Sequence, residues 1–134
     1  MRQKIVYGIN IMWFEYGMAV EHFKSVLGAY QFVKDSVDLE LKVYANRQTY
    51  IEEPVSDEIF TTFEDTLVES LIGLHMEPNV SVDLQWIEMD REFWCAPDAR
   101  RETKNPDGWV VWGEIDCLLP DRFFVGLIES SKLI

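Results

Sequence analysis

The chain has 134 residues, of which 48% are hydrophobic and 13% aromatic, so it can form one domain with a hydrophobic core and is not a disordered chain. Its 24 acidic against 12 basic residues give a net charge of −12, which argues against the basic surface that nucleic acids and anionic membranes require. No leader pattern opens the chain, and no apolar run approaches the roughly 20 residues of a membrane span. We therefore expect a cytoplasmic protein in which Cys95 and Cys117 are free thiols.

The first third of the chain predicts a strand followed by a helix. Residues 4–12 are rich in β-branched and aromatic residues, as in a buried strand, and an aromatic loop follows at 13–17. That loop either packs on its own side chains or forms a wall for a flat ring such as a nucleobase. Residues 18–36 have helical spacing, and we expect His22 at the surface of this helix. The expected apolar stripe consists of Ala19, Val20, Phe23, Val26, Leu27, Tyr30 and Val33.

A second strand, helix and strand follow in the same pattern. Residues 39–45 alternate between apolar and polar side chains, and the polar cluster after them is either a turn or part of a ligand-binding edge. Ser56 is a typical N-cap for the next helix. Residues 80–86 alternate again and predict a third strand. The apolar stripe of the helix consists of Ile59, Phe60, Phe63, Leu67, Leu71 and Leu74.

The last part of the chain contains a charged segment, a strand and a helix. Residues 90–108 contain two prolines and many charged residues. The adjacent Arg100 and Arg101 in this segment either form salt bridges or hold an anion. Residues 109–115 predict a buried strand. Pro120 suits the first turn of a final helix with an apolar stripe from Phe123 to Ile128.

The order of these elements predicts an α/β fold in a single domain covering residues 1–134. Strands that alternate with helices form a mostly parallel sheet, here of about four strands, with helices on both faces as in a Rossmann-like three-layer sandwich. Right-handed crossovers would bring the carboxyl ends of the strands to one edge of the sheet. We expect Asn10, Asn46, Glu114 and Asp116 at that edge, where such folds bind ligands.

Glu114 and Asp116 form the most chemically informative pair in the sequence. In an extended chain, side chains two positions apart point to the same face, so the two carboxylates would repel each other. A divalent cation relieves that repulsion, and Mg²⁺ and Mn²⁺ prefer carboxylate oxygens. The alternative is that both acids are simply solvated at the end of a strand.

Four segments resemble the nucleotide-binding, N-terminal half of GT-A-fold glycosyltransferases of the family-2-like type found among tailed phages and bacteria. The segment with the E-x-D pair resembles the metal-bearing strand end of that family, which more often has D-x-D. The others resemble the first strand with its loop, the second strand with its polar end, and a D-x-R-R element. The segments are INIMWFEYG, LELKVYANRQTYIE, PDARRE and WGEIDCLLPDRFF.

The resemblance implies a site for a nucleotide-diphosphate sugar with Mn²⁺ or Mg²⁺ as cofactor. Asp116 would hold the metal against the diphosphate, and Glu114 would bind it through water or face the ribose. Asn10 and Asn46 would lie near the nucleotide, with Asn46 where the family more often has Asp. Arg100 or Arg101 would steady the phosphates with bidentate hydrogen bonds.

The chain also departs from that family. Its members generally continue well past the metal motif, into a half that supplies the acceptor site and the catalytic base, so the resemblance implies a donor site alone. An exposed edge of the sheet would favour a homodimer. A different reading is an acidic, non-enzymatic interaction protein of the immunity or anti-defence type, whose basic protein partner meets a surface that includes Glu114 and Asp116.

Overall fold

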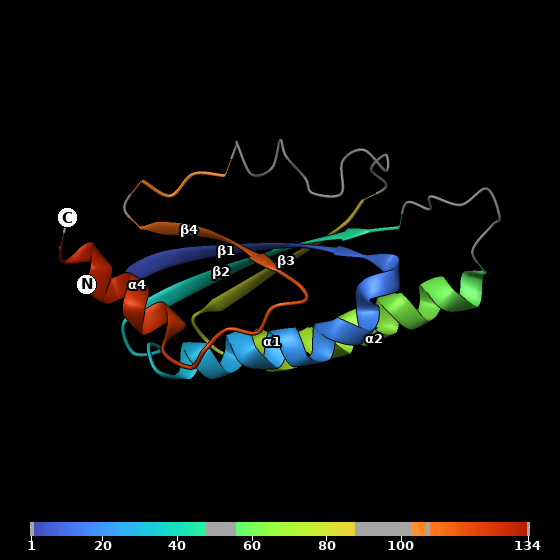
Figure 1. Ribbon diagram of the computed structural model, residues 1–134, viewed down its shortest axis with the longest axis horizontal. Coiled ribbons are helices and arrows are strands. Elements are labelled where there is room, and N and C mark those ends of the chain that lie inside the picture. The colour runs from blue at the N-terminus through green and yellow to red at the C-terminus, as the bar shows by residue number, and fades with distance from the viewer. Residues whose placement is uncertain (1, 48–55, 88–102, 107, 134) are drawn as a thin grey trace.

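The computed structural model describes residues 2–47, 56–87, 103–106 and 108–133, and these form an α/β fold around a parallel sheet (Figure 1). The sheet has four strands in the order β3-β2-β1-β4, and every neighbouring pair is parallel. The predicted α/β class with a parallel sheet of about four strands is thereby confirmed, and the strand order is compatible with a three-layer Rossmann-like sandwich. The helices expected on the second face of the sheet are not among the described residues. The strands are β1 (Gln3–Met12), β2 (Val37–Asn46), β3 (Val80–Ile87) and β4 (Trp109–Glu114).

The three described helices all contact the same face of this sheet. Figure 1 shows α1 (Tyr16–Gln31) and α2 (Asp57–His75) side by side along it. The third helix, α4 (Phe123–Ser131), packs there too, because the Phe124 ring meets the edge of the Tyr7 ring at 6.3 Å. A short 3-10 helix, η1 (Trp13–Glu15), joins β1 to α1.

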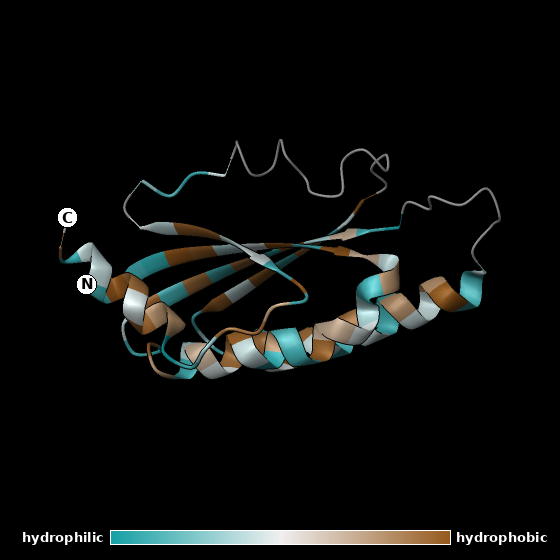
Figure 2. Ribbon diagram, in the orientation of Figure 1, coloured by the Kyte–Doolittle hydropathy of each residue, from teal (hydrophilic) through white to brown (hydrophobic). Residues whose placement is uncertain are grey.

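The hydrophobic core lies between this sheet face and the helices. Alternate residues of a strand point to opposite faces, so β1 turns one set of side chains to the helices and β2 does the same. Full burial of a valine, leucine or isoleucine side chain stabilises the folded state by roughly 1.5–3 kcal/mol relative to leaving it exposed. Figure 2 shows the alternation of apolar and polar residues along the strands. The buried residues of the two strands on this face are Ile5, Tyr7, Ile9, Ile11, Leu39, Leu41, Val43 and Ala45.

Several helix predictions need correction. The first helix ends at Gln31 rather than at residue 36, because Val33 and Ser36 donate backbone hydrogen bonds to carbonyls three residues earlier, as in turns. Val20 and Ile59 were predicted to be core but are 41% exposed, since each lies at the margin of its apolar stripe. Pro120 precedes α4 instead of forming its first turn, and its carbonyl accepts a hydrogen bond from the Phe123 N–H at 3.0 Å.

Two local predictions about α2 and the aromatic loop can also be assessed. Ser56 is the N-cap of α2, as expected, and its Oγ accepts a hydrogen bond from the Ile59 N–H at 3.4 Å. Trp13 packs edge-on against Phe60 of α2, with ring centroids 6.1 Å apart. This contact favours the packing interpretation of the loop for Trp13.

None of the helices in the described part of the chain is long and apolar enough to span a membrane.

Candidate functional site at the carboxyl edge of the sheet

The strand order reverses between β1 and β4, whose carboxyl ends lie at the same edge of the sheet. The chain places β2 and then β3 on one side of β1, and it places β4 on the other side. In parallel α/β sheets, ligands bind where the strand order reverses in this way. Asn10 of β1 lies opposite Glu114 of β4 in the parallel register, so both reach this point.

Three carboxylates share this part of the sheet edge. Glu114 is the last residue of β4, Asp116 lies in the turn after it, and both are exposed. Glu15 of η1 is half-buried, and its Oε1 accepts a hydrogen bond from the Met12 N–H at 2.9 Å. Burial raises the pKa of Glu15, and the negative charges of Asp116 and Glu114 raise it further, while the Met12 hydrogen bond opposes this. The edge therefore concentrates negative charge that a cation would neutralise.

Sequence reasoning missed Glu15. We expected the aromatic segment around it to contribute only rings, although an acid three residues after a strand end could have signalled a second carboxylate at the same edge. The proximity to Glu114 and Asp116 follows from the pairing of β1 with β4, which spacing along the chain does not reveal.

The two asparagines lie at the same edge as the acids. Asn46, the last residue of β2, is 1% exposed and lies opposite Met12 in the register, one strand away from Glu114. Residues paired in register share a face, so Asn10, Asn46 and Glu114 all belong to the face that is turned away from the described helices. Arg100, Arg101 and Cys95 lie outside the described residues.

An aromatic pair lies on that same face, next to Asn10. The rings of Trp112 and Tyr44 stack at 5.8 Å with an angle of 25° between their planes. Gly8 of the intervening strand permits this stack, because a Cβ there would come within 2.8 Å of the Trp112 ring. Trp112 precedes Glu114 by two positions, so the same strand carries a flat ring and a carboxylate on one face.

His22 anchors the turn that carries Asp116, and it is fully buried rather than at the surface as expected. Its Nδ1 lies 2.6 Å from the Cys117 carbonyl oxygen, which can only accept, so Nδ1 carries the proton. Burial lowers the pKa of His22 and favours the neutral ring, although the Cys117 carbonyl and the charge of Asp116 oppose this. Nε2 of the neutral ring therefore accepts a hydrogen bond from the Tyr7 hydroxyl at 3.1 Å.

A second hydrogen bond from α1 fixes the next residues of this turn. The Leu119 N–H donates to Ser25 Oγ at 3.0 Å, and that hydroxyl in turn donates to the His22 carbonyl at 2.6 Å. His22 and Ser25 lie three residues apart, on the same side of α1. The turn from Asp116 to Leu119 is thus attached to α1 at two points, which holds the carboxylates against the sheet edge.

Gly113 is required by the same packing. A Cβ at position 113 would collide with the Tyr7 hydroxyl, because Ile9 and Gly113 are register partners and Tyr7 lies on the same face of β1. A glycine therefore precedes the E-x-D pair, because the Tyr7 hydroxyl, which bonds His22, occupies the space that a Cβ would need.

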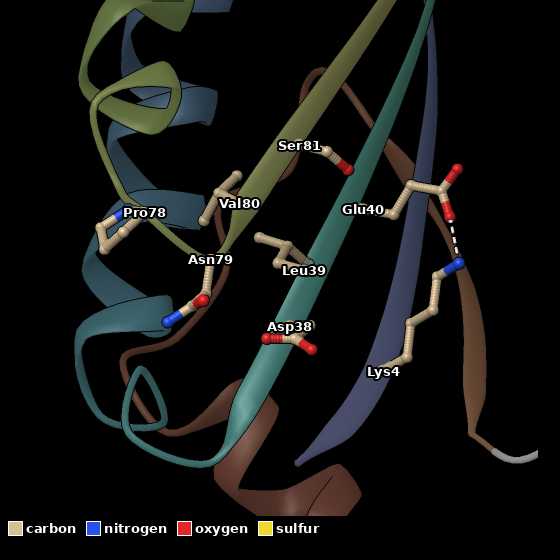
Figure 3. A pocket seen from close by; sticks show the side chains of 8 residues that line it. All are labelled: Lys4, Asp38, Leu39, Glu40, Pro78, Asn79, Val80 and Ser81. Carbon is tan, nitrogen blue, oxygen red and sulfur yellow. Dashed lines mark ion pairs between the residues drawn. The ribbon is translucent and has the colours of Figure 1, made fainter.

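A cavity of about 280 Å³ lies at the opposite, amino edge of the sheet (Figure 3). Figure 3 shows the side chains of Lys4 and Glu40, from the neighbouring strands β1 and β2, pointing toward each other, and their charged groups are 2.8 Å apart. Its position at the amino ends of β1, β2 and β3 separates it from the three carboxylates. The lining residues are Lys4, Asp38, Leu39, Glu40, Pro78, Asn79, Val80 and Ser81.

Comparisons of the chain with protein-family models, with curated proteins and with solved structures found no match. No family is therefore shown. The glycosyltransferase resemblance rests on the four sequence segments, and the assignment of a function rests on the chemistry of the sheet edge.

Two kinds of cation site can be compared with the described residues: one built from protein ligands alone, and one completed by water and a bound phosphate. Within the described ranges, no group of three or more His, Cys, Asp and Glu residues is placed to hold a metal ion by itself. Mg²⁺, however, is commonly bound through one or two carboxylates and completes its shell with water and substrate phosphates. Glu114 and Asp116 are the two exposed carboxylates at the β4 end from which a site of this second type would be built.

Proposed function

We propose that the carboxyl edge between β1 and β4 binds a nucleoside diphosphate together with Mg²⁺ or Mn²⁺, as the donor site of a nucleotide-sugar-dependent glycosyltransferase. The observation that carries this proposal is the concentration of Glu15, Glu114 and Asp116 at the reversal of strand order. In a protein with a net charge of −12, a bound cation would offset the repulsion between these carboxylates and an anionic ligand.

Each residue has a defined part in this proposal. Glu114 and Asp116 hold the cation, and the His22 and Ser25 hydrogen bonds keep their turn in place. The bound cation would supply Lewis-acid stabilisation of the charge on the leaving diphosphate. Trp112 is partly buried and stacks on the buried Tyr44 ring beside Asn10, and it would be the ring that contacts a nucleobase at this edge.

A thermal-shift experiment with UDP, GDP, CDP and dTDP, each with Mn²⁺ and with EDTA, tests the proposal. A ligand at about 100 times its Kd stabilises the native protein by about 2.7 kcal/mol, which is a readable change in Tm. We expect one nucleotide to raise Tm in Mn²⁺ and to lose this effect in EDTA. Release of the nucleoside diphosphate from the matching nucleotide sugar would then report the transferase reaction or its hydrolytic side reaction.

A matched pair of variants makes the test specific. Asp116→Asn should abolish the Mn²⁺-dependent shift while leaving the Tm of the free protein close to that of the wild type. Asp83→Asn, which removes an exposed carboxylate from the distant strand β3, should leave the shift intact. A nucleotide shift that survives both Asp116→Asn and Glu114→Gln would refute the site, as would the absence of any shift in folded protein.

A further inference from the structure

The outward side of α2 carries exposed aliphatic side chains in a row. Val68 and Ile72 are each 50% exposed, and Met76, just after the helix, is 78% exposed. Residues four positions apart lie along one side of a helix, so the three form a continuous line. The opposite side of α2 is already packed into the core through Phe63, Leu67, Leu71 and Leu74. The exposed line is therefore additional to the apolar stripe that the fold uses.

The same side of α2 is acidic. The helix contains five acidic residues and neither lysine nor arginine. Asp65 and Glu69 lie three residues before Val68 and Ile72, so they border the aliphatic line. Within the described ranges neither of them forms an ion pair, whereas Glu64 pairs with Arg47 at 2.5 Å. We call the set Asp65, Val68, Glu69, Ile72 and Met76 the α2 stripe.

The charge of the α2 stripe determines which partner suits it. A second copy of the chain would bring Asp65 and Glu69 of both molecules together, and burying like charges in an interface costs several kcal/mol. An anionic lipid surface would be repelled for the same reason. A helix with apolar residues at matching spacing and flanking lysines or arginines would cover the aliphatic side chains and neutralise both carboxylates.

We propose that the α2 stripe is the docking surface for a basic amphipathic helix of a protein partner. Val68, Ile72 and Met76 contact the apolar face of that helix, as in other helix-on-helix recognition. Asp65 and Glu69 pair with its basic residues and fix its orientation. The surface belongs to the helical layer, whereas Asn10, Asn46 and Glu114 belong to the opposite face of the sheet, so docking does not depend on the nucleotide site.

A titration with two synthetic peptides tests this proposal. One is an 18-residue amphipathic leucine–lysine helix, and the other replaces every lysine by glutamate. In spectra of ¹⁵N-labelled protein, we expect the leucine–lysine peptide to shift amide signals centred on residues 65–76 and the leucine–glutamate peptide to shift none. Shifts centred on other residues, such as 114–116, would overturn the proposal.

Paired variants separate the apolar from the charged contribution. Val68→Ser combined with Ile72→Ser should weaken binding of the leucine–lysine peptide at least tenfold. Asp65→Asn combined with Glu69→Gln should weaken it and also reduce its dependence on salt. Val20→Ser combined with Glu21→Gln, an equivalent exposed pair on α1, should leave the affinity unchanged.

Two further results would contradict the docking of a basic helix. The first is an affinity that stays the same in the Val68 and Ile72 double variant, with circular dichroism showing the protein folded. The second is a homodimer in sedimentation equilibrium that the Ile72→Ser substitution dissociates, since the stripe would then be occupied by a second copy. The nucleotide-induced Tm shift should be the same in every stripe variant, so the two proposals can fail independently.

Discussion

The Tyr7 hydroxyl lies 3.1 Å from His22 Nε2, and this contact links the central strand to the turn that carries Asp116. Tyr7 donates to the ring of His22, and the ring donates through Nδ1 to the Cys117 carbonyl at 2.6 Å. Burial raises the pKa of Tyr7, so the phenol keeps its proton at neutral pH. One continuous chain of hydrogen bonds therefore runs from β1 through α1 to the candidate site.

Replacing His22 should destabilise the protein to a degree that depends on which hydrogen bonds survive. His22→Leu leaves the buried Tyr7 hydroxyl without its acceptor and should lower the free energy of unfolding by about 2 kcal/mol. His22→Asn should cost less, because its amide can still donate to the Cys117 carbonyl. Urea denaturation measures both, and equal losses in the two variants would show that the Cys117 bond contributes nothing.

The coupling between Tyr7 and His22 can be measured separately. In a double-mutant cycle of Tyr7→Phe and His22→Leu, we expect an interaction energy of about 1 kcal/mol, since the two side chains are direct partners. The double variant should be more stable than the sum of the single effects implies, because it leaves no unpaired hydroxyl. Strict additivity would contradict the hydrogen bond.

His22 should make stability depend on pH in a defined direction. Its pKa in the folded protein is lowered by burial below the ordinary value of 6.5. The unfolded state therefore binds more protons, and the contribution of His22 is complete above about pH 6.5 and is lost as the pH falls toward the folded pKa. The difference in unfolding free energy between wild type and His22→Asn should shrink over this range, whereas a constant difference would contradict the shift.

Glu15 should make the stability of the protein depend on pH in the opposite direction to His22. Its folded pKa is raised above 4.5, first by burial and then by Asp116 and Glu114, so its stabilising contribution is present below pH 4.5 and is lost as the pH rises through the folded pKa. Glu15→Gln should therefore raise Tm at pH 7 by more than at pH 4, because glutamine can still accept the Met12 hydrogen bond. A Tm gain that is the same at both pH values would argue against the charge effect.

The electrostatic link between Glu15 and the pair of acids can be read by NMR. Titration of the side-chain carboxyl carbons should give a lower pKa for Glu15 in Asp116→Asn than in the wild type. Addition of Mg²⁺ with the bound nucleotide should lower it again, since a cation favours the charged carboxylate. An unchanged pKa in Asp116→Asn would show that these carboxylates do not interact.

Gly113 and Gly126 form a matched pair for testing the packing around Tyr7. Gly113→Ala should lower the free energy of unfolding by about 1–3 kcal/mol, because its Cβ meets the Tyr7 ring and hydroxyl. Gly126→Ala, in α4, has no atom within 4 Å of the added Cβ and should raise stability by up to about 1 kcal/mol through helix propensity. Thermal unfolding of the two variants provides the comparison, and similar Tm values would contradict the collision.

Much of the sheet could be predicted because its signals are local. The alternation in residues 39–45 and 80–86 follows from the opposite orientation of neighbouring side chains in a strand, and both strands are present. The helix at residues 18–36 was extended too far, because its apolar spacing continues into a turn where only hydrogen-bond geometry marks the end. Val20 and Ile59 were wrongly predicted to be buried, because the apolar spacing of a helix indicates which side faces the core but not how wide the buried surface is.

The sequence by itself determined the class of the fold and placed Glu114 and Asp116 at the carboxyl end of a strand, of which Glu114 is the last residue while Asp116 lies in the turn that follows. Only the tertiary structure decided that Glu15 lies beside them, that His22 is buried and holds their turn, and that Val68, Ile72 and Met76 remain exposed. The physical reason is the range of the interactions. Periodicity records which side of its own element a residue occupies, whereas hydrogen bonds and charge pairs between distant segments depend on the order of the strands, which periodicity does not encode.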